Sequence, residues 1–356
     1  MNELNGRNDF IDMLKALAII FVVVAHCIQF GSGQEVLSRD LYFEDPVFKF
    51  ITSFHMPLFM LISGYLFAFS VGRRKCREVF FGKLRSLVLP LFSWAVVVTG
   101  IFVVSGVLNG SGIAAPVEII SQLIYYFFHN FWFLWAVFWS SCIVLIGRSF
   151  FNDSLLFYTF VLVLTVFLPD EHCISLYKFM YPYFVIGYLF NTSDSNNKVL
   201  FRTIVRSPAV LIVTWILFVA LIFFYNTDSY VYTSGYTILR EGAVNLRQLG
   251  IDLYRFLIGL VGSSAFILIL KLVYPYVNRN VQKGIGYIGM NSIGIYILSF
   301  VIFNDHLLRT FSVRLHGVNY VIVLVESIVV IAVTLLLSFL IKQFRFANTI
   351  FLGGRK

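Results

Sequence analysis

Long apolar runs restrict the folds open to this chain more than any other property of its sequence. Ten runs approach the roughly 20 residues that an α-helix needs to cross a bilayer. They fall at about residues 11–30, 48–71, 86–107, 130–147, 154–169, 174–190, 208–225, 251–272, 286–303 and 318–341. A spanning segment must satisfy its own backbone hydrogen bonds in lipid, so each run predicts a helix. The sequence therefore predicts an all-α, polytopic integral membrane protein with about ten transmembrane helices.

The composition agrees with this class. The 356 residues are 59% hydrophobic and only 13% charged, whereas soluble domains average about 45–50% apolar and 25% charged residues. No polar stretch is long enough for a soluble domain, so we expect residues 1–356 to form a single transmembrane domain. The first run is longer than the apolar core of a signal peptide and is not followed by a small-x-small cleavage site, so we expect it to remain in the mature protein.

The basic residues indicate how the chain is oriented. With the N-terminus in the cytoplasm, most of the 27 Lys and Arg residues fall in cytoplasmic segments, as the positive-inside rule requires. Both termini are then predicted to be cytoplasmic. This distribution accounts for the net charge of +9 without nucleic acid as a partner. The four cysteines are scattered along the sequence, which predicts neither a disulfide framework nor a metal site.

The first apolar run carries a polar stripe. In a helix, Asp12, Lys15 and His26 project to nearly the same side, with Lys15 and His26 about 16 Å apart along the axis. A charge at the centre of a membrane costs at least about 2.5 kcal/mol, so such residues usually face a protein interior or a water-filled cavity. The alternative is that Asp12 and Lys15 reach the cytoplasmic headgroups, while His26 is a neutral packing residue.

The second run places a second histidine at a similar depth. His55 lies near the outer end of this run, and antiparallel packing would bring it level with His26 in the outer half of the membrane. Two imidazoles there predict an acid/base centre. Alternatively, His55 caps or packs, helped by the helix distortion at Pro57. Ser63 is too far inside to be a strong candidate nucleophile, but we include it as a candidate residue of the acceptor cavity.

Several Lys and Arg residues follow the second apolar run, in the segment GRRKCREVFFGKLR. Arg73, Arg74 and their neighbours could bind a multi-phosphate ligand. They could equally anchor to anionic lipid and set the topology, which is the more expected use of Arg73, Arg74 and Lys75. Arg85 differs because it abuts the next apolar run, and we expect it to be drawn toward the interior.

Later segments add two further candidates for a cavity. Trp132 opens the fourth run in an aromatic pattern. Glu326 is a lone carboxylate within the last run, which is costly unless it is paired, and Arg255 is our candidate partner. The longest outer loop, at about residues 226–250, is rich in tyrosine. It suits a carbohydrate or a solvated loop, and we expect the solvated loop.

Several of these segments resemble the membrane-bound acyltransferase family 3. The family's first helix carries a basic residue, ten further residues and a histidine, as Lys15 and His26 do here after the matching Asp12. FHMPLFMLISGYLF resembles its second-helix signature, and KLRSLVLPLFSW resembles the motif that enters its third helix. The sequence differs from many relatives in having Lys15 in place of Arg, and Ser299 where His is frequent.

The resemblance implies a compact O-acyltransferase without a fused extracytoplasmic domain, multi-pass in the plasma (bacterial inner) membrane. Such an enzyme takes an acyl group, most often acetyl, from cytoplasmic acyl-CoA and transfers it to a hydroxyl of a cell-surface or exported polysaccharide. Acetyl-CoA is then the donor substrate, and no tightly bound cofactor is implied. We expect His26 to be the general base, with His55 orienting it or sharing the proton. Lys15 and Arg85 would hold the pantetheine phosphates or neutralise Asp12.

Other functions stay open at this point. An O-succinyltransferase of the same family would use another donor, and a covalent acyl-histidine relay is a variant of the mechanism. A carbohydrate exporter or a proton-coupled transporter would also carry ionisable residues within its helices. A structural subunit of a polysaccharide-assembly complex would leave the polar stripe unexplained. The expected partners are acyl-CoA, a carbohydrate acceptor and membrane lipid, with a homodimer or polysaccharide-assembly machinery as further candidates.

Overall fold

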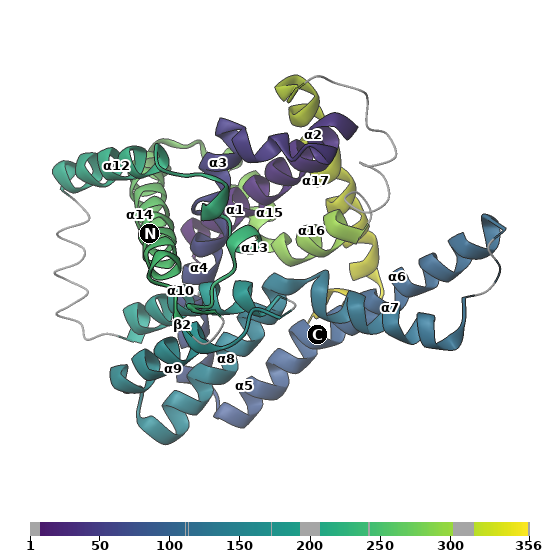
Figure 1. Ribbon diagram of the computed structural model, residues 1–356, viewed down its shortest axis with the longest axis horizontal. Coiled ribbons are helices and arrows are strands. Elements are labelled where there is room, and N and C mark those ends of the chain that lie inside the picture. Colours follow the sequence, from purple (N-terminus) through teal and green to yellow (C-terminus); the bar gives the residue numbers. More distant parts are fainter. Residues whose placement is uncertain are drawn as a thin grey trace.

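The computed structural model describes residues 8–110, 112, 114–171, 173–192, 207–240, 243–301 and 317–354. Helices account for most of these residues, and two short antiparallel strands, β1 (Leu239–Arg240) and β2 (Ala243–Val244), form a hairpin (Figure 1). The predicted all-α class is therefore confirmed. The predicted cytoplasmic position of the termini concerns residues 1–7 and 355–356, which lie outside the described residues.

Long helices alternate with short helical segments along the chain. The first half contains α1 (Asp9–His26), the π-helix η1 (Cys27–Gly31), α2 (Gln34–Ser38), η2 (Leu41–Glu44), α3 (Pro46–Thr52), α4 (His55–Arg73), α5 (Cys76–Lys83), the π-helix η3 (Leu84–Val88), α6 (Leu89–Leu108), α7 (Pro116–His129), α8 (Trp132–Phe151) and α9 (Leu155–Phe167). The second half contains α10 (Ile174–Thr192), α12 (Pro208–Ile222), η4 (Thr227–Ser229), α13 (Val231–Ser234), α14 (Leu246–Val273), η5 (Tyr274–Tyr276), α15 (Arg279–Met290), α16 (Ser292–Leu298), α17 (Tyr320–Gln343) and α18 (Arg345–Leu352).

Fewer helices than the ten predicted are long and apolar enough to cross a membrane. Among the described residues there are six such segments, or seven if the pair α15 and α16, bent by 55°, is one span. They are Asp9–Gly31, Pro46–Arg73, Cys76–Leu108, Trp132–Phe151, Leu246–Tyr276 and Tyr320–Gln343. The prediction of ten was too high because α9 and α12 have only 13 and 15 residues. In addition, several tyrosines and Lys178 make α10 less apolar.

Helix α1 runs through the middle of the bundle, in contact with α3, α4, α14, α15, α16 and α17 (Figure 1). Asn8 caps its N-terminus by accepting a hydrogen bond from the Phe10 N–H at 3.1 Å. Gly289 of α15 lies directly against the backbone of Asp12, where a Cβ would collide with the carbonyl oxygen. Close packing of this kind explains how α1 can be buried along much of its length.

Helices α4 and α10 are packed backbone to backbone. A Cβ on Gly64 of α4 would collide with the Phe184 carbonyl, and a Cβ on Gly187 of α10 would collide with the Leu61 carbonyl. Small residues at these crossing points let the two helices approach more closely than side chains would permit. The contact fixes the helix whose first residue is His55.

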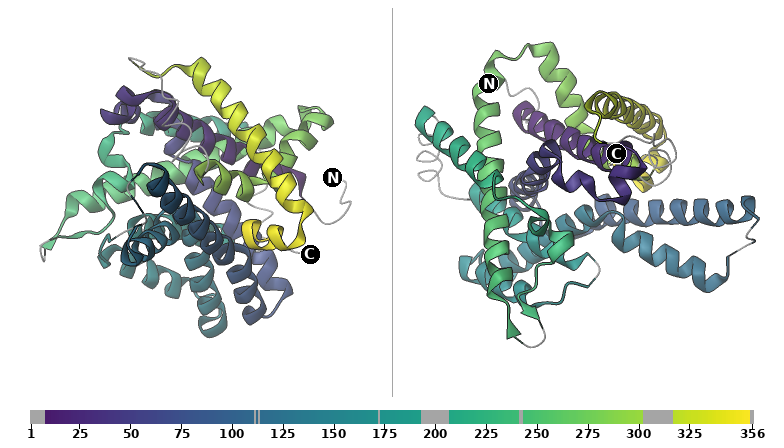
Figure 2. Two further views of the ribbon diagram at one scale, coloured as in Figure 1. Left: turned by 90° about the vertical axis from the view of Figure 1, so that its right-hand side faces the viewer. Right: turned by 45° about the horizontal axis from the view of Figure 1, so that its top comes forward.

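Helices α6 and α7 form an antiparallel hairpin that extends away from the remaining helices (Figure 2). Its base is tied to the C-terminal helix α18, because the Trp94 indole donates a hydrogen bond to the Phe351 carbonyl at 2.9 Å. This hydrogen bond fixes the hairpin to the C-terminal end of the chain.

Candidate functional site

A cavity of about 320 Å³ lies at the ends of α1 and α4, and both His26 and His55 line it. Its other polar lining residues are Gln29, Thr52, Ser53, Tyr225, Ser229, Tyr230, Tyr232, Arg255 and Tyr296. Apolar and aromatic side chains, among them Trp132 and Phe300, complete the wall. Cavities of this size, largely apolar with a few convergent polar groups, are typical of small-molecule sites.

His55 occupies a break in the second membrane segment. Helix α3 ends at Thr52 and α4 begins at His55, so the imidazole lies at the first turn of a new helix. Pro57 is tolerated there because backbone N–H groups in a first turn have no helical partner. The His55 Nδ1 lies 2.8 Å from the Ile51 carbonyl oxygen. A carbonyl can only accept, so Nδ1 carries the proton and the neutral ring has Nε2 as an acceptor.

His26 also lies at an irregular point, as the last residue of α1 before the π-helix η1. Single-turn π-helices are frequent at functional sites because they change the direction of the side chains beyond them. The His26 ring stacks on Phe30, with the ring centroids 5.8 Å apart. Its buried Nδ1 has no hydrogen-bond partner among the described residues. A buried polar atom of this kind is available to a ligand.

Asp12 and Lys15 are brought together, but at the other end of α1. The Lys15 ammonium lies 2.9 Å from the Asp12 carboxylate, and the Lys15 side chain is 21% exposed. Neither residue lines the cavity. Of the two roles expected for Lys15, this geometry displays the neutralisation of Asp12.

The expected inward position of Arg85 is wrong. Arg85 is exposed in the π-helix η3, whereas Leu87 and Pro90 of the same segment are buried. The π-helical turn directs the apolar residues inward and leaves the guanidinium on the surface. Arg73 and Arg74 are also exposed, and the Arg73 guanidinium lies 5.9 Å from the centre of the Phe69 ring.

Of the three residues expected to line the acceptor cavity, only Trp132 does so. Ser63 is partly buried in α4, away from the cavity. Glu326 packs against Gly31 of η1, and its buried Oε2 has no hydrogen-bond partner among the described residues. The expected pair of Glu326 with Arg255 is wrong, because Arg255 is bound to Asp252 at 2.9 Å and to the loop that precedes α14.

That loop forms a part of the site that was not expected from the sequence. We expected residues 226–250 to be solvated, but Tyr230 is only 2% exposed and its hydroxyl donates to the Phe43 carbonyl at 3.3 Å. Tyr230 and Tyr232 both line the cavity. The high tyrosine content of this segment was the signal that could have identified it as part of the cavity wall.

An ion pair anchors the far end of this loop. The Asp170 carboxylate lies 2.6 Å from the Lys178 ammonium and accepts hydrogen bonds from the backbone N–H groups of Tyr236 and Thr237 at 2.6 and 2.7 Å. Burial raises the pKa of Asp170, but these hydrogen bonds and the ammonium outweigh it and hold the pKa below its ordinary value. The loop is thus fixed by a carboxylate that is ionised at neutral pH.

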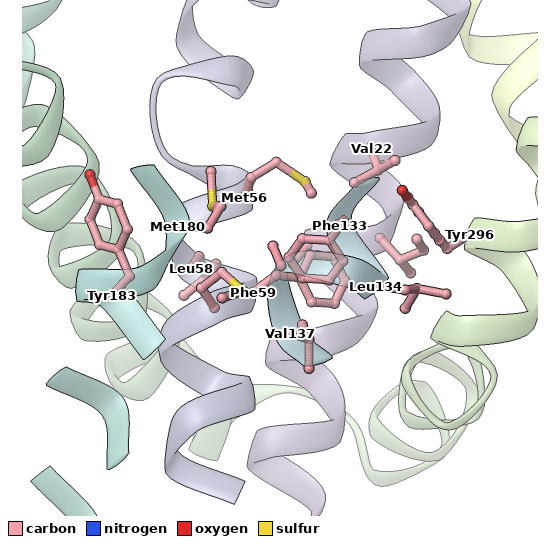
Figure 3. Packing of buried hydrophobic residues seen from close by; sticks show 14 of the residues in the cluster. Val22, Met56, Leu58, Phe59, Phe133, Leu134, Val137, Met180, Tyr183 and Tyr296 are labelled. Atoms are coloured by element: carbon pink, nitrogen blue, oxygen red, sulfur yellow. The ribbon is translucent and has the colours of Figure 1, made fainter. Parts of the chain in front are cut away.

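A packed layer adjoins the cavity near Ile19 and Val22 of α1, which lie between Lys15 and His26 along the helix. Phe59, Phe133 and Tyr296 meet there, with centroid distances of 5.6 Å for Phe59–Phe133 and 6.0 Å for Phe133–Tyr296 (Figure 3). A recess of about 30 Å³ lies within this layer, and it shares Val22, Met56 and Tyr296 with the main cavity. Along α1 the order is therefore the ion pair, the layer and the histidine.

These features define an all-α, multi-pass membrane protein with two histidines facing a cavity. Within the described part of the chain, no cluster of three or more His, Cys, Asp or Glu side chains could hold a metal ion. The sequence model of the family described as "Acyltransferase domain" matches residues 8–343, and the chain belongs to that family.

Two curated relatives are both named "Nodulation protein NolL". The protein from Mesorhizobium japonicum is 27% identical over 191 residues, which cover 52% of this chain and 48% of the relative. The protein from Sinorhizobium fredii is 27% identical over 233 residues, covering 65% and 61%. The chain thus spans less than two thirds of the length of these relatives. No solved structure matches the chain.

Proposed function

We propose that this chain is an integral membrane O-acyltransferase of the plasma (bacterial inner) membrane. It transfers an acyl group from cytoplasmic acyl-CoA to a hydroxyl of a cell-surface or exported glycan. The observation that carries the proposal is that His26 and His55 line one cavity in a member of an acyltransferase family. Histidine is suited to this role because its unperturbed pKa lies near neutrality.

The chemistry assigns a role to each imidazole. His26 accepts the proton of the acceptor hydroxyl as its oxygen attacks the thioester carbonyl. A C–O bond forms, the C–S bond breaks, and the leaving CoA thiolate takes the proton from His26, which restores the neutral base. His55, whose Nε2 is left as an acceptor by the hydrogen bond between Nδ1 and Ile51, orients the hydroxyl or shares its proton. Such general-base assistance contributes typically about 10²–10⁴-fold to a rate.

The donor approaches from the Lys15 end of α1. Arg73, Arg74 and Arg85 are exposed cations on the connection from α4 to α6, and guanidinium groups suit the phosphates of CoA. The pantetheine arm then reaches the histidines through the layer formed by Phe59, Phe133 and Tyr296, which moves to admit it. The recess in this layer is small and mostly apolar, which favours acetyl over succinyl, because a succinyl carboxylate would be buried there without a partner.

A labelled-transfer assay tests the proposal. Purified protein in detergent is incubated with radiolabelled acetyl-CoA and a crude pool of surface glycans from the organism that encodes it. We expect label on carbohydrate with the parent and none with His26→Ala. His129→Ala is the matched control, because His129 lies on α7 outside the cavity lining. Equal transfer by His26→Ala and the parent would contradict the role of His26 as general base. Glycan transport without any acylated product would favour a transporter.

A further inference from the structure

We infer that the sugar residue held in the main cavity is uncharged: a neutral hexose, deoxyhexose or N-acylated sugar rather than a uronic acid, a phosphorylated sugar or a free amino sugar. The inference rests on the proposed function and specifies its acceptor. The evidence for it is the set of charged side chains in the cavity wall and the hydrogen bonds that these side chains make with the protein.

Arg255 is the one permanently charged side chain among the described residues that line the cavity. The described lining contains no Asp, Glu or Lys. The histidine that acts as general base is neutral when the acceptor binds, since only the unprotonated ring can accept the hydroxyl proton. Whether the cavity can attract an anion therefore depends on what Arg255 binds.

Every nitrogen of the Arg255 guanidinium already donates to the protein. Nε donates to the Ser229 carbonyl at 3.0 Å. Nη1 donates to the Gly235 carbonyl at 2.6 Å and to the Asp252 carboxylate at 2.9 Å. Nη2 donates to the Asp228 carbonyl at 2.6 Å and to the Ser234 hydroxyl. With a side chain only 1% exposed, Arg255 fixes the loop wall and has no donor left for a ligand.

Asp252 is the carboxyl that lies against the Arg255 guanidinium. Its Oδ1 accepts hydrogen bonds from Arg255 at 2.9 Å and from the Gln248 amide at 3.0 Å. The carboxylate side chain is 5% exposed and does not line the cavity. No charged group of the described lining is therefore free to bind the acceptor, and a carboxylate or ammonium there would be buried without a hydrogen-bonded counter-charge, which is strongly unfavourable.

The remaining wall suits a neutral sugar ring. Trp132, Tyr230 and Tyr232 offer aromatic surface for the C–H faces of a pyranose, and Gln29 offers an amide for its hydroxyls. At about 30 Å³ for each water-sized group, the cavity of about 320 Å³ has room for about ten such groups, close to one hexose ring. The size and lining thus agree with one uncharged sugar residue.

The test locates the acyl group on the product. Radiolabelled acetyl-CoA and the glycan pool are incubated with the parent protein, and labelled oligosaccharides are sequenced by mass spectrometry to identify the acylated residue. We expect the label on a neutral residue. Label on a uronic acid, a phosphorylated sugar or an amino sugar with a free amine would overturn the inference while leaving the proposed function intact. Label on no carbohydrate contradicts the proposed function, and the inference fails with it.

A second arm changes the charge of the wall. Gln29→Lys places a cation in the cavity lining, and Gln122→Lys adds the same charge on α7, outside the cavity lining. A neutral oligosaccharide competes with its C6-oxidised uronate counterpart as acceptors. The parent and Gln122→Lys should prefer the neutral acceptor at least tenfold, and Gln29→Lys should reduce that ratio at least tenfold. Preference of the parent for the uronate would overturn the inference.

Discussion

The Nδ1 atom of His55 lies 2.8 Å from the carbonyl oxygen of Ile51, across the break between α3 and α4. At the break the Ile51 carbonyl accepts the Phe54 N–H at 3.4 Å in a turn, and the imidazole adds a second, shorter hydrogen bond to the same oxygen. The same contact selects the tautomer whose Nε2 is an acceptor. The break between α3 and α4 thus leaves Nε2 of His55 as an acceptor for proton transfer in the cavity that this residue lines.

Replacing His55 distinguishes a chemical role from a packing role. The amide nitrogen of Asn can reproduce the Nδ1–H hydrogen bond to Ile51, but Asn has nothing in place of Nε2. We expect His55→Asn to keep its thermal unfolding temperature in detergent and to lose about 10²–10⁴-fold in labelled transfer. Full activity of His55→Asn would show that His55 only packs.

The contact between α4 and α10 predicts a stability effect. Gly64→Ala and Gly187→Ala should each destabilise the protein by about 1–3 kcal/mol, because a Cβ would collide with a carbonyl of the facing helix. Gly284→Ala on α15, where no atom lies within 4 Å of a Cβ, is the control. It should be neutral or slightly stabilising, since Ala favours helix over Gly. Unfolding temperatures in detergent check this, and equal values for the three variants would contradict the observed packing.

The aromatic layer predicts that a mutation can separate hydrolysis of acetyl-CoA from transfer of the acetyl group to the acceptor. Phe133→Ala removes the ring that contacts both Phe59 and Tyr296, so water should reach an acyl-CoA thioester more easily. We expect hydrolysis of acetyl-CoA without acceptor to rise several-fold while transfer to glycan falls. Phe160→Ala, at a position 57% exposed on α9, should change neither rate. Unchanged hydrolysis in a folded Phe133→Ala protein would show that the layer does not control access.

The Asp170–Lys178 pair predicts a pH dependence. The folded-state pKa of Asp170 lies below its ordinary value, so the pair stabilises the fold above the ordinary pKa. This contribution disappears as the pH falls through the folded-state pKa. At pH 7, Asp170→Asn should lower stability by on the order of 3 kcal/mol, because it leaves a buried ammonium without its carboxylate. The difference between parent and variant, measured by chemical denaturation, should shrink at acidic pH; a difference that stays constant there would contradict this assignment.

Features that depend on the length and depth of helices could be predicted from the sequence. His26 and His55 were predicted to lie at a similar depth, and they line one cavity. This was predictable because the position of a residue within a spanning helix determines its depth in the membrane. Lengths also predicted the all-α class, although four of the ten runs do not count as spans by themselves. Those of α9, α10 and α12 are too short or too polar, and the run at 286–303 counts only as part of the bent pair α15 and α16.

Tertiary partners were not predictable in the same way. Nothing in the periodicity of α14 shows that Arg255 binds carbonyls of a loop about 20 residues earlier, so a distant Glu326 was an equally reasonable partner. Arg85 was misplaced because a π-helix changes which side chains face inward, and its apolar neighbours do not reveal that turn. The tyrosine-rich loop was expected to be solvated because its burial depends on contacts with α10 and with the segment around Phe43 rather than on its own composition.

The most direct test of the account is a sided reconstitution. Protein is inserted into liposomes, radiolabelled acetyl-CoA is enclosed inside, the glycan pool is added outside, and the orientation is established by protease cleavage. With the cytoplasmic face inside, the parent should transfer label to external glycan, and His26→Ala should transfer none at equal incorporation. Equal labelling by His26→Ala and the parent, or labelling only when donor and acceptor share one side, would contradict transfer across the membrane through the histidine cavity.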